Sequence, residues 1–373
     1  MEVRKEVEAF LCTAQYCSVT TDLWTARHQV RGFLSLTCHA IDDEWVLRSM
    51  VLNTREVAVD HTAENVSATL KEMMIEWNIK DKVVGSSTDN GKNIVNAMKI
   101  LGIFNMPCVG HTLQLSVLKS FQLGPVSKML IRLRSIAGHF HRSTKAAAKL
   151  REQQLLGLPV HELINDCNTR WGSTYSMLKR FIEQQQPICA VFLEDRDARQ
   201  FMPSDDEISA AELVAVLEVF HSATEIVSGE TYPTLGIVLP LLHKLLSHTL
   251  ADAESDKGLT KKINKAIRDD LESRYQDVDV RKQLSIAMYL DPRFKAMSFL
   301  DDSERKDVRF DVKMELVELI DAIQQVEKDS TELEPTTELN TSSNGDGNGT
   351  CTSRNEPPVV KKRKLTKLSL IHI

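Results

Sequence analysis

The sequence predicts a mixed α/β unit that is followed by a large all-helical region. Three β-rich runs near the start are joined by short links, and helix and strand patterns then alternate up to about residue 124. Helical periodicity is nearly continuous beyond Gly124-Pro125. These patterns divide the chain into a sheet unit at 1–124, an all-helical insertion at 125–300, a helix at 301–327 and a disordered tail at 328–373.

The sheet unit is predicted to begin with a helix and three strands. Residues 1–16 are predicted to form the end of a helix. Strands are predicted to follow at Tyr16–Leu23, Arg31–Ile41 and Trp45–Leu52. The polar link 42–44 is typical of a hairpin turn. Thr62 is a plausible N-cap for a helix that runs to about Trp77. The remaining pattern predicts a strand from Val83, a helix from Asn93, a short strand at Met106 and a helix from His111.

That element order is the order of the ribonuclease H-like fold, in which the first and fourth strands are parallel neighbours. The crossover helix makes this geometry natural. Asp22 and Asp89 would then lie at neighbouring strand ends, where two carboxylates suit Mg²⁺ or Mn²⁺. Two-metal phosphoryl transfer needs a third acid, and no later Glu stands out. The alternative is that both residues are ordinary turn aspartates.

The helical region predicts one long basic helix, or two, over Val126–Leu156. Further helices are expected at Phe181–Leu193, Ser209–Ser228, Leu235–Leu250, Lys261–Tyr275 and Val312–Val326. The tail is rich in Thr, Ser, Asn, Gly and Pro and has no apolar period, which favours disorder. It contains a basic cluster that resembles a nuclear import signal, made of Lys361, Lys362, Arg363 and Lys364.

Charge is unevenly distributed along the chain. Residues 90–151 hold ten Lys and Arg and no Asp or Glu, so this segment carries +10 while the rest of the chain carries -16. Such a block favours a polyanionic partner, and we expect DNA. The alternative is a solvated helix face.

Cysteine usage and hydropathy indicate the kind of cellular compartment in which the protein works. The seven cysteines form no CxxC pair, which favours a reducing compartment over a disulfide framework. No signal peptide opens the chain. The most apolar stretch, Leu235–Leu246, is too short to span a bilayer, so no membrane contact is expected.

Two short motifs have both a functional and a structural interpretation. Cys108 and His111 have a spacing that would supply two zinc ligands, but no second pair is evident, so we expect no zinc site and place both residues at the crevice. Arg170-Trp171 would hold phosphate and stack on an unpaired base. The residues alone favour the other interpretation, a core Trp beside a capping Thr or Asn.

Taken together, the motifs resemble the hAT transposase superfamily, and most of all the BED-type zinc-finger proteins derived from it. The likeness covers about residues 10–300. It rests on the segments TTDLWT at 20–25, TDNGKN at 88–93, CVGHTL at 108–113, TRWGSTY at 169–175, SGETYPT at 228–234 and LDPRFK at 290–295.

The resemblance implies roles for individual residues. Asp22 and Asp89 match the first two acids of the family's Asp-Asp-Glu triad and would hold Mg²⁺ or Mn²⁺ in an active member. Trp24, Cys108, His111, Arg170 and Trp171 match positions near the active site and the DNA end, and the Trp of the Arg-Trp pair stacks on a flipped base in active members. The helical region matches the insertion domain.

The sequence also departs from the family pattern. The BED finger with its zinc, the third acid and the C-terminal dimerisation segment are not found, and Gln114 replaces the usual Asn. We therefore interpret the chain as a fragment of a protein that would form a homodimer. The last six residues are what CTG TCT CTT ATA CAC ATC encodes, which resembles a sequencing-library transposon end, and we hypothesise that they are not biological.

The resulting prediction is a nuclear DNA-binding protein of transposase ancestry, a domesticated transcriptional regulator whose incomplete triad catalyses nothing. The predicted DNA-binding residues are Trp24, Cys108, His111, Lys128, Arg132, Arg134, Arg142, Arg170 and Trp171. Three alternatives remain open: a fragment of an active Mg²⁺-dependent cut-and-paste transposase, a SUMO ligase-type regulator like one BED-finger relative, and a dimerising scaffold that no longer touches DNA.

Overall fold

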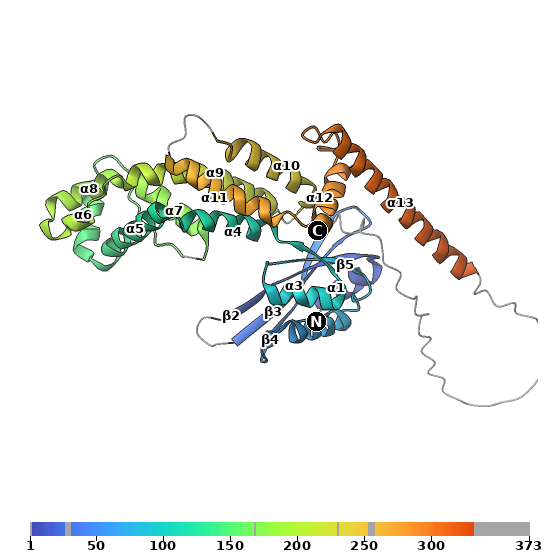
Figure 1. Cartoon of the computed structure of the whole chain (residues 1–373). Coiled ribbons are helices and arrows are strands. Elements are labelled where there is room, and N and C mark those ends of the chain that lie inside the picture. Colours follow the sequence, from blue (N-terminus) through green and yellow to red (C-terminus); the bar gives the residue numbers. More distant parts are fainter. Residues whose placement is uncertain (1, 27–30, 168, 230, 253–257, 332–373) are drawn as a thin grey trace, which may run out of the picture.

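The computed structural model describes residues 2–26, 31–167, 169–229, 231–252 and 258–331. It confirms a mixed α/β fold in which a sheet unit is joined to a long arm of helices (Figure 1). The expected tail and its basic cluster at 361–364 lie outside the described residues, except for the tail's first four positions. None of the described helices is long and apolar enough to cross a membrane.

Six strands form one sheet. The central order is β4-β3-β1-β5-β6, and β2 continues along β3 beyond the end of β1. Strand β1 pairs in parallel with β5, and β5 in parallel with β6, whereas the pairs made by β3 are antiparallel. The parallel contact expected between the first strand and the strand after the crossover helix is therefore confirmed. The strands are β1 (Cys17–Thr21), β2 (Leu23–Ala26), β3 (Arg31–Ile41), β4 (Leu47–Val57), β5 (Val83–Thr88) and β6 (Phe104–Pro107).

Three helices build the core of the sheet unit: α1 (Glu2–Thr13), α2 (Ala63–Glu76) and α3 (Lys92–Leu101). Alternate residues of β3, such as Leu34 and Leu36, pack with Leu70 and Met73 of α2 in one apolar cluster. Thr62 is confirmed as the N-cap of α2, because its side chain accepts the Asn65 amide.

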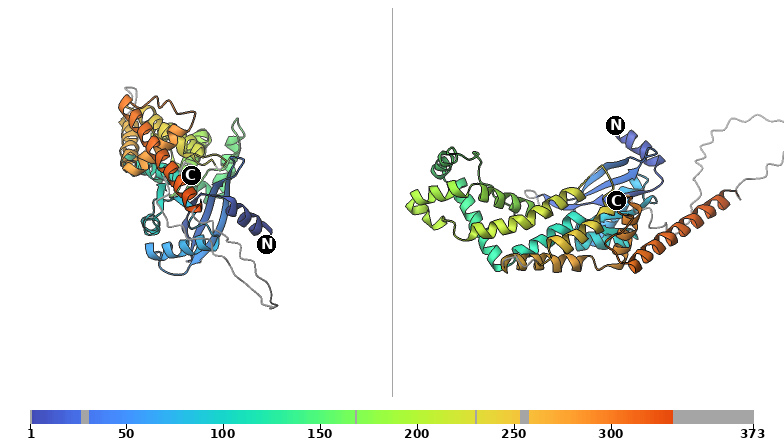
Figure 2. Two further views of the ribbon diagram at one scale, coloured as in Figure 1. Left: turned by 90° about the vertical axis from the view of Figure 1, so that its right-hand side faces the viewer. Right: turned by 90° about the horizontal axis from the view of Figure 1, so that it is seen from above.

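The arm is built from nine α-helices and three short helical segments of the described chain (Figures 1 and 2). The α-helices are α4 (Val109–Phe121), α5 (Gly124–Arg142), α6 (Thr144–Gln154), α7 (Trp171–Glu183), α8 (Gln185–Glu194), α9 (Asp206–Val227), α10 (Val238–Lys244), α11 (Gly258–Arg274) and α12 (Val278–Leu290). The short segments are η1 (Arg196–Phe201), η2 (Leu235–Ile237) and η3 (Leu245–Thr249). A final helix, α13 (Asp302–Thr331), projects away from the arm.

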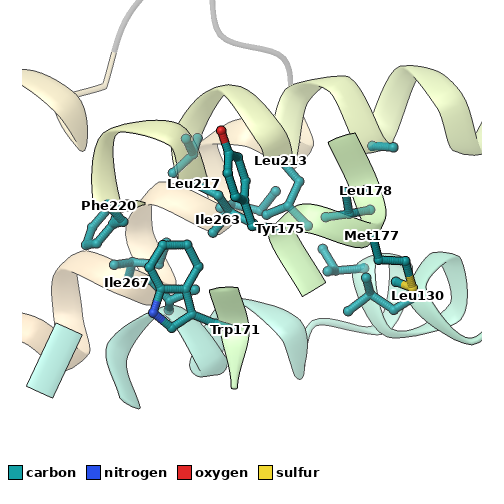
Figure 3. Packing of buried hydrophobic residues seen from close by; sticks show 14 of the residues in the cluster. Leu130, Trp171, Tyr175, Met177, Leu178, Leu213, Leu217, Phe220, Ile263 and Ile267 are labelled. Carbon is teal, nitrogen blue, oxygen red and sulfur yellow. The ribbon is translucent and has the colours of Figure 1, made fainter. Parts of the chain in front are cut away.

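The arm has its own hydrophobic core, which is the largest in the described chain (Figure 3). Leu113 and Val117 of α4 belong to this core rather than to the cluster under the sheet. By its packing, α4 is thus the first helix of the arm. The boundary predicted from the sequence, at residue 124, would instead assign α4 to the sheet unit.

Several element boundaries differ from the sequence prediction, and three of them bear on the site and the arm. The run Tyr16–Leu23 is broken at Asp22, so four strands rather than three precede α2. The basic stretch 126–156 forms two helices because Ser143 is extended and its side chain caps α6 through the Ala146 amide. Helix α13 runs to Thr331, past the predicted end at 327 and into the segment expected to be disordered from 328.

Candidate functional site

Asp22 and Asp89 directly follow two neighbouring, parallel strands of the sheet. The register pairs Thr21 of β1 with Thr88 of β5, so each aspartate is the residue that directly follows a paired position. Neighbouring strands lie about 4.8 Å apart, and side chains alternate between the two faces. This register places the two residues beside each other, and continued alternation would put both carboxylates on the same face of the sheet. Asp22 is exposed and Asp89 is half-buried.

Asp22 does not lie at the end of the sheet, as a strand-end acid would. Its amide donates to Ser35 Oγ over 3.3 Å, and its carbonyl accepts the Ser35 amide over 3.0 Å. The chain then continues as β2 along the same neighbour, β3. Asp22 thus occupies a break between β1 and β2, and contacts from β3 hold its backbone.

Asp89 is positioned by the turn that follows it. Its Oδ1 accepts the Gly91 amide over 3.1 Å, and Thr88 Oγ1 donates to the Asp89 carbonyl over 2.8 Å. A Cβ added at Gly91 would lie 2.9 Å from Asp89 Oδ1. The glycine therefore leaves the space that the carboxylate needs for this hydrogen bond.

The start of α4 is tied to the Asp89 turn. The Cys108 amide donates to the Thr88 carbonyl over 2.9 Å. Thr112 Oγ1 donates to the Cys108 carbonyl over 2.9 Å and accepts from Asn90 Nδ2 over 3.1 Å. Cys108 and His111 are both half-buried: Cys108 is the N-cap of α4, and His111 lies in the first turn of that helix.

Tyr275 packs on this corner from the end of α11, and sequence patterns did not single it out. Its side chain is buried, and burial raises the pKa of its hydroxyl, which lies beside Thr112 without a well-aligned hydrogen bond. Tyr275 is far from Thr112 along the chain, so only the fold could reveal this contact. It joins the end of α11 to the Asn90–Thr112 link.

Trp24 lies two residues after Asp22, and alternation places it on the same face. Its ring stacks on Phe33 with centroids 5.8 Å apart, and 39% of the residue is exposed. A flat aromatic surface is thus open to solvent beside the carboxylate pair.

Arg170 and Trp171 are neighbours in the sequence but lie in different surroundings: Arg170 is exposed and Trp171 is buried. Arg170 is exposed at the N-cap of α7, and the Thr169 carbonyl accepts a 2.6 Å hydrogen bond from Gln114 Nε2 of α4. Trp171 is only 4% exposed, with its ring beside Tyr175 and His221 in the arm core (Figure 3). This placement differs from the expected base-stacking role, because the buried ring presents no free face to a nucleobase.

The four basic residues predicted to bind DNA on α5 also divide into two kinds. Lys128 and Arg142 are exposed. Arg132 donates instead to the Met202 carbonyl, and Arg134 pairs with Asp166. Two of the four thus have partners within the arm and hold it together, whereas a phosphate contact by any of the four stays a prediction.

Asp22 and Asp89 form a candidate site for a divalent cation. Mg²⁺ is commonly held by one or two carboxylates together with substrate phosphates. Asp22 and Asp89 fit that role, since Asp22 is exposed and only Oδ1 of Asp89 is engaged by the backbone. Within the described residues, no group of three or more His, Cys, Asp and Glu side chains could hold a metal ion.

Comparison with known proteins identifies the class. Residues 20–115 match the family described as the ZBED1 RNase-like domain, and residues 106–217 match the ZBED1 RNase-like helical domain. The two matches overlap at the start of α4, where the sheet unit and the arm join.

Similar proteins include both zinc-finger proteins and transposases. The chain is 26% identical to zinc finger BED domain-containing protein 4 of Homo sapiens over 80% of its own length and 26% of that protein. It is 24% identical to RICESLEEPER 3 of Oryza sativa subsp. japonica over 74% of the chain and 39% of the relative. It is 25% identical to the Hobo transposase of Drosophila melanogaster over 66% of the chain and 35% of that protein.

The fold and the two family matches define an RNase-like core joined to a helical domain. The chain belongs to the hAT/ZBED-like proteins. It spans about a quarter to two fifths of the length of these three relatives.

Proposed function

We propose that the chain is the DNA-contacting core of a nuclear transcriptional regulator of transposase ancestry. The observation that carries this proposal is the acid-free segment 90–151, whose exposed cations Lys128 and Arg142 lie on α5 of the arm. The exposed Trp24 ring offers a stacking surface near the carboxylates.

The basic surface of α5, which includes Lys128 and Arg142, lies apart from the Asp22–Asp89 pair. Helix α4 starts at the Asp89 turn and has 13 residues, which corresponds to about 20 Å of helix before α5 begins. A duplex that contacts α5 thus lies along the arm, and the carboxylates are reached only by DNA that also spans α4. DNA binding and cation chemistry are accordingly separable by mutation.

The binding test measures DNA affinity of the purified chain against salt concentration. Replacing Lys128 and Arg142 by Gln removes two phosphate contacts, so the slope of log K against log salt should fall in magnitude by about 1.8. The matched control replaces Lys5 of α1 and Lys71 of α2 by Gln. Both lysines are also exposed, and their helices pack against the sheet and not in the arm. An unchanged slope in the first variant, or an equal loss in the control, contradicts the proposal.

The retained carboxylate pair favours one rival, an active transposase. Asp22 and Asp89 would hold a cation that supplies Lewis-acid stabilisation to a phosphate, and two-metal chemistry would need a further acid. In our proposal the chain binds DNA without cleaving it. Strand cleavage with Mn²⁺ that disappears when Asp22 and Asp89 are replaced by Ala would establish the rival instead.

A further inference from the structure

The hairpin between β3 and β4 carries an exposed tryptophan at its tip. Trp45 is 82% exposed, more than any other large apolar residue of the described chain. Its φ is 62°, in the left-handed region where a bulky side chain is strained and where hairpins usually place glycine. Exposure and backbone conformation both disfavour tryptophan at this position, which points to a role in recognition rather than in stabilising the fold.

The Trp45 turn (residues 42–46) is held by its own hydrogen bonds. The Trp45 amide donates to the Asp42 carbonyl over 3.0 Å, and the Asp42 amide donates to the Val46 carbonyl over 3.1 Å. The Asp42 carboxylate accepts the amides of Glu44 and Val46, over 3.1 and 2.8 Å, and Arg48 Nε over 2.8 Å. The ring is therefore presented on a preorganised turn, which a partner does not have to order on binding.

The charges beside the ring favour a cationic partner. Asp42 already pairs with Arg48, whereas Asp43 and Glu44 are exposed and form no ion pair within the described residues. The face of a tryptophan ring attracts the guanidinium of Arg and the ammonium of Lys. A ring flanked by two unpaired carboxylates therefore selects a segment rich in Lys and Arg, and it repels DNA.

The Trp45 turn lies at the end of the sheet opposite to Asp22. Thr20 of β1 pairs with Thr37 of β3, and Ser18 pairs with His39, so β3 passes the start of β1 before it reaches the turn. Asp22 instead follows the end of β1. A partner on the Trp45 turn thus leaves the proposed DNA-contacting surface free.

The chain itself contains a segment of the required chemistry. The longest run of cations in the sequence is 361–364, and the segment 359–367 carries +5 with no acid and with Val or Leu on both sides of the run. Residues 332–358 connect it to the end of α13, and these 27 residues span up to about 90 Å when extended. That reach is twice the length of α13, about 45 Å for 30 residues. The segment lies outside the described residues, so its sequence and its reach identify it as the occupant.

We propose that the Trp45 turn is a docking surface for a basic segment, and that its occupant is segment 359–367 of the same chain. The indole face holds one cation of the segment, and Asp43 and Glu44 pair with its neighbours. Docking covers the cluster 361–364, which resembles a nuclear import signal, and so withholds it from other partners. This contact does not depend on the proposed DNA binding.

The test is carbodiimide cross-linking of the whole chain, which joins a carboxylate to an amine only where the two are in contact. Peptide mapping by mass spectrometry identifies the linked residues. Asp43 and Glu44 should be linked to the lysines of 361–364 at least about tenfold more often than the exposed reference acids Glu6 and Glu152 are. In a mixture of isotope-labelled and unlabelled chains, each linked pair of peptides should carry a single isotope, because docking occurs within one chain.

Two variants separate docking from a structural role of the ring. Trp45→Gly keeps both carboxylates and removes the strain, because glycine adopts a φ of 62° without steric cost. It should leave the thermal unfolding midpoint close to that of wild type but lower the cross-link yield at least about fivefold. The matched control is Val51→Ser, which removes a 73% exposed apolar side chain from the same hairpin and should leave the yield unchanged.

Salt provides a measurement that needs no substitution. At about 1 M sodium chloride charges are screened beyond about 3 Å, so the wild-type yield should fall to that of the reference acids. The proposal is overturned if Asp43 and Glu44 are linked no more often than the reference acids, or if linked peptides carry both isotopes. It is equally overturned if the yield survives Trp45→Gly or high salt.

Discussion

Arg134 donates two hydrogen bonds of 2.7 Å to the carboxylate of Asp166, whose side chain is 2% exposed. Thr174 Oγ1 of α7 donates a third, over 2.6 Å. These contacts tie α5 and α7 to the loop that leads to Arg170. A residue expected to hold phosphate therefore holds the arm together, and this has measurable consequences.

Replacing Arg134 by Gln should lower the free energy of unfolding by about 3 kcal/mol, because it leaves a buried carboxylate without its counter-charge. Urea denaturation provides the measurement. Lys128→Gln is the control on the same helix, and as an exposed change it should stay within about 0.5 kcal/mol of wild type. Equal stability of both variants would show that the Arg134–Asp166 pair contributes nothing.

The same pair predicts a pH dependence. Burial raises the pKa of Asp166, but the hydrogen bonds from Arg134 and Thr174 outweigh burial and hold that pKa below its ordinary value. A carboxyl with a depressed pKa in the folded state contributes stability above its unfolded pKa of about 3.9 and loses it as the pH falls through the folded value.

The stability difference between wild type and Asp166→Asn should therefore be constant from neutral pH down to about 5 and shrink below about 4. Urea denaturation at a series of pH values measures the difference. A gap that stays the same down to pH 3 would mean that the charge of Asp166 is not stabilising.

Trp171 should behave as a core residue. Trp171→Ala should cost about 3–5 kcal/mol of stability, because the ring is buried beside Tyr175. Trp171→Phe keeps most of the apolar volume and should retain both the fold and the DNA affinity. If the Phe variant folds normally but binds DNA much more weakly, the indole has a contact with DNA that this conformation does not present.

Gly91 should control the Asp89 carboxylate. A Cβ there would lie 2.9 Å from Oδ1, so Gly91→Ala must displace the side chain. If the pair holds a cation, Mn²⁺ affinity measured by electron paramagnetic resonance should fall about tenfold or more in this variant. Gly110→Ala is the control, because an added Cβ there meets nothing within 4 Å. Unchanged Mn²⁺ affinity in Gly91→Ala would remove Asp89 from the proposed site.

Local sequence patterns were sufficient to predict most of the strands and helices of the sheet unit. The alternation in β3, the Thr62 cap and the crossover helix α2 all follow from neighbouring residues, and the strand order then follows from few allowed topologies. The break at Asp22 was not predictable in this way, because it depends on backbone contacts with Ser35 of another strand.

The site was predictable only in part for the same reason. Whether Arg134 faces DNA or Asp166 depends on a contact between residues 32 positions apart. Trp171 allowed both a functional and a structural interpretation, and only the packing of α7 against the arm core distinguishes them. Tyr275 carried no local signal, since its neighbour Thr112 is on a helix far away in the chain.

The account depends on the meeting of residues 22 and 89, and a disulfide tests it most directly. Asp22→Cys and Asp89→Cys are combined in a Cys108→Ser background, because Cys108 adjoins the same turn. Mild oxidation should join the two new thiols in nearly every molecule, since neighbouring strands lie within the span of a disulfide. Peptide mapping by mass spectrometry identifies the linked pair. If the two thiols stay free, or pair only with distant cysteines, the carboxylates do not converge and the proposed site does not exist.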